Sequence, residues 1–107
     1  MTDFTLKDLE TIIASKATDD PLKSWTAKLI SAGPEEIAKK LGEEATETII
    51  AALTESKGAF VAESADLIYH WMVLARAKDV SLEEVLLELE RRTAQSGLAE
   101  KASRKAD

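Results

Sequence analysis

The chain contains no cysteine, and this absence excludes several kinds of site at once. A sequence of 107 residues without a thiol forms no disulfide, no thiolate zinc site and no iron–sulfur cluster, and it has no cysteine nucleophile. Redox chemistry by the protein's own side chains is therefore excluded. The lack of cysteine also fits a reducing cytoplasm, and we expect a cytoplasmic protein.

Glycine and histidine are scarce as well. The four glycines, at positions 33, 42, 58 and 97, stand alone, so the chain has no Walker A loop, no dinucleotide-binding glycine motif and no nucleophile elbow. His70 is the single histidine, which excludes metal motifs that need two. Beside Tyr69 and Trp71, a lone histidine is more often structural than catalytic.

Long apolar runs and an excess of basic residues are also missing. The longest nearly uncharged apolar stretch, Leu67–Ala75, is about half of the roughly 20 residues that a membrane span requires. Residues 1–10 carry three acids and no apolar core, unlike a secretory signal. With 14 basic and 20 acidic side chains, the net charge is −6, whereas general nucleic-acid binding requires surplus lysine and arginine. We expect no membrane or nucleic-acid partner.

The charge is distributed unevenly along the chain. Residues 1–90 hold nine basic and eighteen acidic side chains, whereas residues 91–107 hold five and two. A basic carboxy-terminal tail, from about residue 95, therefore follows an acidic body. Such a tail is suited to contact phosphate groups.

Helix-forming residues are abundant. The sequence contains 17 alanines and 13 leucines, few β-branched clusters and no Asn-Gly or Asp-Gly hairpin turn. We predict an all-α fold, a helical bundle of about five helices. Because no repeat or flexible linker divides the chain, we expect a single domain over residues 1–107. The predicted helices are Leu6–Ser15, Ser24–Ala32, Glu35–Ser56, Ala59–Lys78 and Leu82–Arg92.

Capping residues define several of these boundaries. Thr5 suits the N-cap of the first helix, and Gly33, followed by a proline, ends the second helix and begins the third. Ser81 with Glu84 three residues later forms a capping box for the fifth. The third and fourth helices are expected to be separated by Gly58 and to form a central antiparallel αα-hairpin.

Two acidic pairs lie on this hairpin. Side chains three positions apart on a helix are neighbours, so Glu44 with Glu47 and Glu63 with Asp66 each form a pair. Both pairs lie within about four helical turns of Gly58, so the hairpin can bring the four carboxylates face to face. The ordinary explanation of such pairs is a solvated face of surface salt bridges.

The surroundings of the pairs favour burial over a solvated face. The segment after Glu47 is apolar on every side, and on the fourth helix Glu63, Asp66 and His70 interrupt an apolar stripe. Burying several like-charged carboxylates is costly unless protons or cations compensate. Oxygen ligands without histidine or cysteine suit a hard ion such as Mg²⁺ or Mn²⁺, and Mg²⁺ in turn suggests a phosphate-containing substrate.

Nearby basic residues have two interpretations each. Lys40 precedes Glu44 by four residues, a spacing typical of a helix salt bridge, but it is also placed to meet a phosphate. Lys28 follows Trp25 at a helix start. That grouping suits a phosphate or nucleobase, and it equally suits a capped helix with Trp25 packed in the core.

These segments resemble the phosphoribosyl-ATP pyrophosphohydrolase family, within the all-α nucleotide pyrophosphohydrolase superfamily, over nearly the whole chain. The superfamily motif, Glu-Glu-x-x-Glu followed by Glu-x-x-Asp, occurs at 43–47 and 63–66. A Lys-x-Gly-Glu-Glu lead-in, an Ala-Asp-Leu-x-Tyr-His run and the basic tail narrow the resemblance to this family. Relatives often have tyrosine where this chain has Trp25.

The resemblance implies an enzyme that uses Mg²⁺ and water to hydrolyse 1-(5-phosphoribosyl)-ATP to 1-(5-phosphoribosyl)-AMP and pyrophosphate, the second step of histidine biosynthesis. By analogy, Glu44, Glu47, Glu63 and Asp66 are the metal ligands. Glu43 supports them or positions the water, and Lys28, Lys40 and Arg104 contact substrate phosphates. Two alternatives remain: a housekeeping pyrophosphohydrolase for noncanonical NTPs or dNTPs, and a non-catalytic helical dimerisation module.

Two independent arguments predict a homodimer. Helices 35–56 and 59–78 carry more apolar surface than three short companion helices can cover, so a hydrophobic partner surface is required. The family resemblance also implies helical dimers or higher assemblies. We therefore expect that a second copy of the chain completes the bundle.

Overall fold

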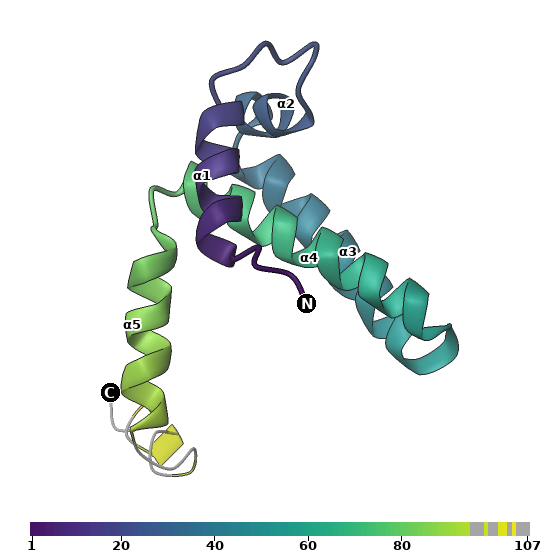
Figure 1. Cartoon of the computed structure of the whole chain (residues 1–107), viewed down its shortest axis with the longest axis vertical. Helices are drawn as coiled ribbons and strands as arrows, with labels where there is room; N and C mark the ends of the chain where they lie inside the picture. Colours follow the sequence, from purple (N-terminus) through teal and green to yellow (C-terminus); the bar gives the residue numbers. More distant parts are fainter. Residues whose placement is uncertain (95–97, 99–100, 103, 105–107) are drawn as a thin grey trace.

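The computed structural model describes residues 1–94, 98, 101–102 and 104. These residues contain no strand, and their helices are α1 (Leu6–Lys16), α2 (Trp25–Ala32), α3 (Pro34–Thr54), α4 (Lys57–Ala77) and α5 (Leu82–Thr93), shown in Figure 1. The all-α prediction is confirmed, and each boundary lies within two residues of its predicted position. None of the helices in the described part of the chain has the length and apolar character needed to cross a membrane.

Local capping chemistry sets the helix ends. Thr5 and Ser81 begin α1 and α5 with capping boxes, in which the hydroxyl accepts from the backbone N–H three residues later. Gly33 ends α2 and precedes α3 with φ of +99°, a left-handed conformation that other residues rarely adopt. Pro34 then occupies the first turn of α3, where its missing N–H costs nothing.

The α3 and α4 helices form a long antiparallel hairpin that projects from the rest of the molecule (Figure 1). The residues between the helices are Glu55 and Ser56, and the Ser56 hydroxyl caps α4 by accepting from the Ala59 N–H. Gly58 therefore lies in the first turn of α4. Our expectation that it separates the two helices is wrong, because the serine cap starts α4 two residues earlier than predicted.

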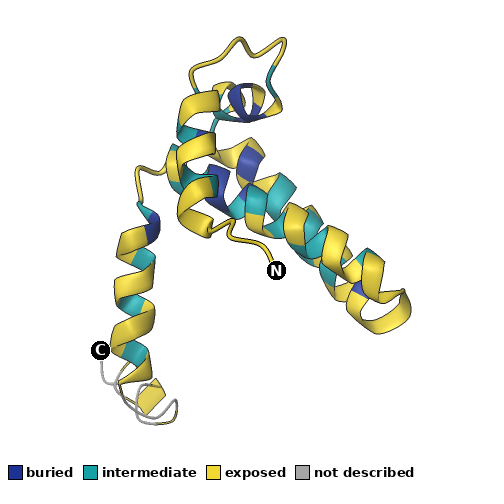
Figure 2. Cartoon of the chain, in the orientation of Figure 1, coloured by how far each residue is buried: buried dark blue, intermediate teal, exposed yellow. Residues whose placement is uncertain are grey.

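The apolar core lies at one end of the hairpin, where α1 and α2 pack against the beginning of α3 and the end of α4 (Figure 2). Its buried residues are Ile13, Leu29, Ile37, Met72, Val73 and Leu82. The first turn of α5 is attached here, because the Leu82 N–H donates over 2.7 Å to the carboxylate of Glu10 in α1. Beyond this turn, α5 extends away from the core (Figure 1).

The apolar surface of the hairpin is largely exposed in the single chain. Ile49, Leu53 and Val61 are 61%, 79% and 58% exposed, so one chain alone does not supply the burial that the apolar sequence of this region predicts. The reason is geometric, since α1 and α2 cover only the opposite end of the hairpin. The radius of gyration is 16.1 Å, against about 13 Å for a compact chain of this length.

Candidate metal centre

Three carboxylates meet between α3 and α4, about midway along the hairpin. Glu44 comes from α3, and Glu63 and Asp66 come from α4, and one carboxylate oxygen of each lies within 4.8 Å of the other two. These three residues are called the acidic cluster below. Glu63 and Asp66 are one turn apart on α4, and the antiparallel hairpin places Glu44 opposite them, as the three-residue spacing predicted.

Glu47, the fourth predicted ligand, is not part of this group of three but adjoins it. Its carboxyl lies within hydrogen-bonding reach of the carboxyls of Glu44 and Glu63, and its side chain is exposed. Its role as a ligand stays a prediction.

Two carboxyls of the acidic cluster, those of Glu44 and Glu63, have raised pKa values. A hydrogen bond with Glu47, desolvation, and repulsion from the neighbouring carboxylates raise the pKa of Glu63 from 4.5 to about 7. Burial, followed by repulsion from Glu47 and Asp66, raises the pKa of Glu44, and nearby His70 opposes this rise. The environment therefore disfavours several bare negative charges side by side.

Two oxygens of the acidic cluster are buried without a partner. The Oε2 atoms of Glu44 and Glu63 accept no hydrogen bond from any of the described residues, whereas buried carboxylate oxygens normally have a donor or a cation beside them. The donor set consists of carboxylate oxygens, which suit Mg²⁺ or Mn²⁺ and not zinc or copper. The residues therefore fit a hard divalent cation.

An aromatic residue of α2 lies close to the acidic cluster. Nε1 of Trp25 is 3.5 Å from Nε2 of His70, whose Nδ1 is 2.7 Å from the carbonyl oxygen of Asp66. Because the indole N–H is only a donor, Nε2 accepts, and Nδ1 carries the proton directed at the carbonyl. Trp25 is 47% exposed, so the alternative that places it in the core is wrong.

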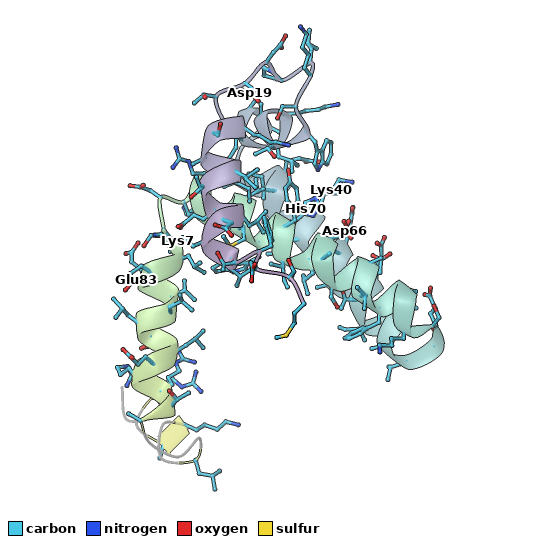
Figure 3. All side chains as sticks on the ribbon, viewed as in Figure 1. Lys7, Asp19, Lys40, Asp66, His70 and Glu83 are labelled. Atoms are coloured by element: carbon cyan, nitrogen blue, oxygen red, sulfur yellow. The ribbon has the colours of Figure 1, made fainter. Side chains whose placement is uncertain are left out.

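Two of the predicted phosphate-binding lysines flank this tryptophan. The ammonium groups of Lys28 and Lys40 lie 6.0 and 5.9 Å from the centre of the Trp25 ring, within range of a cation–π interaction. Figure 3 shows Lys40 in the same region as Asp66 and His70. Positive charge is thus held around Trp25, whose indole is connected through His70 to the backbone of Asp66, and an anionic substrate at the acidic cluster would need such charge nearby.

A known family model matches most of the chain. The family model described as phosphoribosyl-ATP pyrophosphohydrolase matches residues 6–93, the span from the start of α1 to the end of α5. The chain belongs to the phosphoribosyl-ATP pyrophosphohydrolase family. The resemblance inferred from the motifs is confirmed.

Proteins named phosphoribosyl-ATP pyrophosphatase are similar to this family member over nearly their whole length. The one from Rhizobium meliloti (strain 1021) is 59% identical over 97% of each chain. Those from Sinorhizobium medicae (strain WSM419) and Agrobacterium fabrum (strain C58 / ATCC 33970) are 56% and 53% identical, again over 97% of each chain.

The remaining predicted site residues of this family member lie outside the acidic cluster. Lys40 pairs with Glu43 at 3.4 Å, and not with Glu44 as the four-residue spacing suggested, because Glu44 turns toward α4 and Glu43 stays exposed. Arg104 is exposed and comes after α5. Most of the basic tail from residue 95 lies outside the described residues, so its role stays a prediction.

One residue beside the acidic cluster, Thr48, was not predicted from the sequence. Thr48 places its hydroxyl between α3 and α4, within hydrogen-bonding distance of the backbone of both helices. A threonine at the edge of an apolar helical run gives no distinctive signal. The one available hint is its four-residue spacing from Glu44, which allows a hydroxyl to reach that carbonyl.

Proposed function

We propose that this protein is a cytoplasmic enzyme that hydrolyses 1-(5-phosphoribosyl)-ATP to 1-(5-phosphoribosyl)-AMP and pyrophosphate, the second step of histidine biosynthesis. The observation that carries the proposal is the convergence of Glu44, Glu63 and Asp66 in a chain whose five helices match the family. The names of relatives that cover 97% of the chain support the choice of substrate. We treat residues 1–107 as one domain.

In this proposal the metal ligands are Glu44, Glu47, Glu63 and Asp66, and the cofactor is Mg²⁺, with Mn²⁺ as the alternative ion. The unpartnered Oε2 atoms of Glu44 and Glu63 support it. A divalent cation bound here would neutralise the negative charge on the phosphoryl groups when a phosphoanhydride is cleaved. The protein contributes by holding the carboxylates on two packed helices, so that little rearrangement is needed on binding.

Water is the proposed nucleophile. Its oxygen forms a bond to phosphorus as the bridging bond of the α–β phosphoanhydride breaks, and pyrophosphate departs with the electron pair of that bond. The proton of the water passes to a carboxylate, for which Glu43 is the proposed base. The ion pair of Glu43 with Lys40, at 3.4 Å, orients this carboxylate.

Lys28, Lys40 and Arg104 are the proposed contacts to substrate phosphates. Lys28 lies on α2 and Lys40 on α3. The ammonium group of each is about 6 Å from the centre of the Trp25 ring. Cations fixed near the acidic cluster attract the polyanionic substrate and stabilise charge on the departing pyrophosphate. Arg104 would add a third positive charge from the tail.

We also propose a homodimer. The exposed apolar residues of the hairpin, including Ile49, Leu53 and Val61, support a second copy of the chain as the covering partner. The large radius of gyration of the single chain is consistent with a protomer shaped by its neighbour. Light scattering at micromolar concentration is expected to give twice the chain mass, and the mass of one chain would contradict the proposal.

The deciding experiment is pyrophosphate release from phosphoribosyl-ATP with Mg²⁺ present or withheld, run beside dUTP, dCTP and ATP. Release confined to phosphoribosyl-ATP with Mg²⁺ is the expected result. Turnover of the other nucleotides instead would assign the chain to a housekeeping pyrophosphohydrolase. No release from any of them would favour a non-catalytic dimerisation module.

A further inference from the structure

One hydroxyl group links the backbones of α3 and α4 beside the acidic cluster. Oγ1 of Thr48 lies 2.7 Å from the carbonyl oxygen of Glu44 and 3.0 Å from the carbonyl oxygen of Glu63. The first acceptor is one turn earlier on the same helix, and the second is on the facing helix. Both acceptors belong to residues whose carboxylates form the acidic cluster.

The geometry allows this link without disturbing either helix. A hydroxyl has one proton, so the two carbonyl oxygens share it in a bifurcated hydrogen bond. Each carbonyl oxygen has two lone pairs, of which the helical N–H four residues later uses one. The Thr48 hydroxyl can therefore use the second lone pair of both, and it ties the two backbones together at one height along the hairpin.

We propose that Thr48 is a positioning residue that fixes the register of Glu44 against Glu63 and so preorganises the acidic cluster for a divalent cation. The inference rests on the proposed function in one respect, that the acidic cluster is a cation site. Apolar contacts along the hairpin, where Ala51 is buried, are non-directional. A directional bond beside the ligands holds their spacing.

Two other threonines of α3 make hydroxyl hydrogen bonds within the helix only, so they can serve as controls for the bond of Thr48 to α4. The hydroxyls of Thr46 and Thr54 donate to the carbonyl oxygens of Gly42 and Ile50, at 3.1 and 2.8 Å. These bonds stay within α3, and both side chains are exposed. Thr46→Val therefore repeats the change in helix propensity and the loss of an intrahelical hydroxyl bond, but it leaves the bond between α3 and α4 intact.

The test measures the binding of Mn²⁺ to the full chain in the absence of substrate. The concentration of free Mn²⁺ is monitored by electron paramagnetic resonance. We expect Thr48→Val to raise the Kd for Mn²⁺ about tenfold, the lower end of the effect of losing a group that supports metal ligands. Thr46→Val should leave the Kd unchanged, and Thr48→Ser, which keeps the hydroxyl, should bind like the wild type. An unchanged Kd in Thr48→Val would overturn the inference.

Circular dichroism melts in EDTA check that each variant is folded. If Thr48→Val does not fold, the smaller Thr48→Ala replaces it: weaker binding by Thr48→Ala together with wild-type binding by Thr48→Ser supports the hydroxyl, and equal binding by these two variants overturns its role. A second readout is the Mg²⁺ concentration for half-maximal pyrophosphate release. It should rise in Thr48→Val while kcat at saturating Mg²⁺ is recovered, which a general loss of structure would not produce.

The outcomes for the positioning role and for the proposed function are distinguishable. A wild type that binds Mn²⁺ but releases no pyrophosphate contradicts the function, and weaker binding by Thr48→Val still supports the positioning role. An active wild type whose Mn²⁺ affinity is unaffected by Thr48→Val overturns only the positioning role. A wild type that binds no Mn²⁺ overturns it as well, because there is then no cation site to position.

Discussion

The indole of Trp25 lies edge-on to the imidazole of His70, with its Nε1–H directed at Nε2 over 3.5 Å. Through the other ring nitrogen, the same histidine reaches the carbonyl oxygen of Asp66 at 2.7 Å. The helix that carries Trp25 and the helix that carries two of the clustered acids are therefore connected by polar contacts. A distance of 3.5 Å is at the long end for a hydrogen bond, so the energy of this contact is small.

A double-mutant cycle should reveal this contact. Trp25→Phe removes the indole donor and His70→Leu removes its acceptor, and urea denaturation gives the free energy of unfolding of each variant. We expect a coupling of about 0.5 to 1 kcal/mol between the two changes, the net value of one hydrogen bond. Effects that add within experimental error would show that the two rings are energetically independent.

Removing one negative charge from the acidic cluster should have opposite effects on stability and activity. Glu63→Gln relieves repulsion at a carboxyl whose pKa is raised, so we expect a higher Tm in EDTA. Pyrophosphate release should fall by at least on the order of 100-fold, because the variant lacks a proposed metal ligand. Glu90→Gln, at an exposed acid of α5, is the control and should change neither.

The stability of the metal-free protein should depend on pH around neutrality. The pKa of Glu63 is about 7 in the folded protein against an ordinary value of 4.5. Between these values the folded state binds more protons than the unfolded state, so stability falls as the pH rises. In EDTA the Tm should be lower at pH 8 than at pH 5, and Glu63→Gln should reduce the difference.

Divalent cations should oppose the loss of stability at higher pH. Because a cation competes with protons for carboxylate oxygens, Mg²⁺ should raise the Tm more at pH 8 than at pH 5. An equal Mg²⁺ effect at both pH values would indicate binding away from the acidic cluster.

Two glycine substitutions should change stability with opposite signs. Gly33 has φ of +99° at the junction of α2 and α3, so Gly33→Ala should cost about 1 to 3 kcal/mol of unfolding free energy. Gly42 lies within α3, and a Cβ there meets no atom within 4 Å, so Gly42→Ala should stabilise by about 0.5 to 1 kcal/mol. Chemical denaturation of both variants measures the difference, and a stable Gly33→Ala would contradict the strain argument.

The phosphate-binding assignment can be tested with neighbouring lysines. Lys40→Gln and Lys28→Gln should each raise KM for phosphoribosyl-ATP about tenfold, because a charge-assisted contact to phosphate is lost. Lys39→Gln is the matched control, since Lys39 is exposed on the preceding position of α3. Arg104→Ala should also raise KM, and an unchanged value would remove the tail from the substrate site.

The parts of the structure that depend on local chemistry were predictable from the sequence. The capping residues Thr5 and Ser81 sit where the helices begin, and the spacing of the acids on two consecutive helices predicted that carboxylates from both would meet. The contact of Trp25 with His70 joins residues 45 positions apart, and helical periodicity carries no information about such pairs. Periodicity also identified apolar faces on the hairpin without showing whether the same chain covers them.

The one-sided core has a consequence for how local stability varies along the hairpin. Ile37 and Val73 are fully buried near its base, so their amides should exchange with solvent slowly, whereas those near the α3–α4 turn should exchange faster. The acidic cluster lies between these two regimes. If two chains associate over the exposed apolar face and the acidic cluster binds a cation, as proposed, both events stiffen the same segment. We then expect the two equilibria to be linked, so that each raises the affinity of the other.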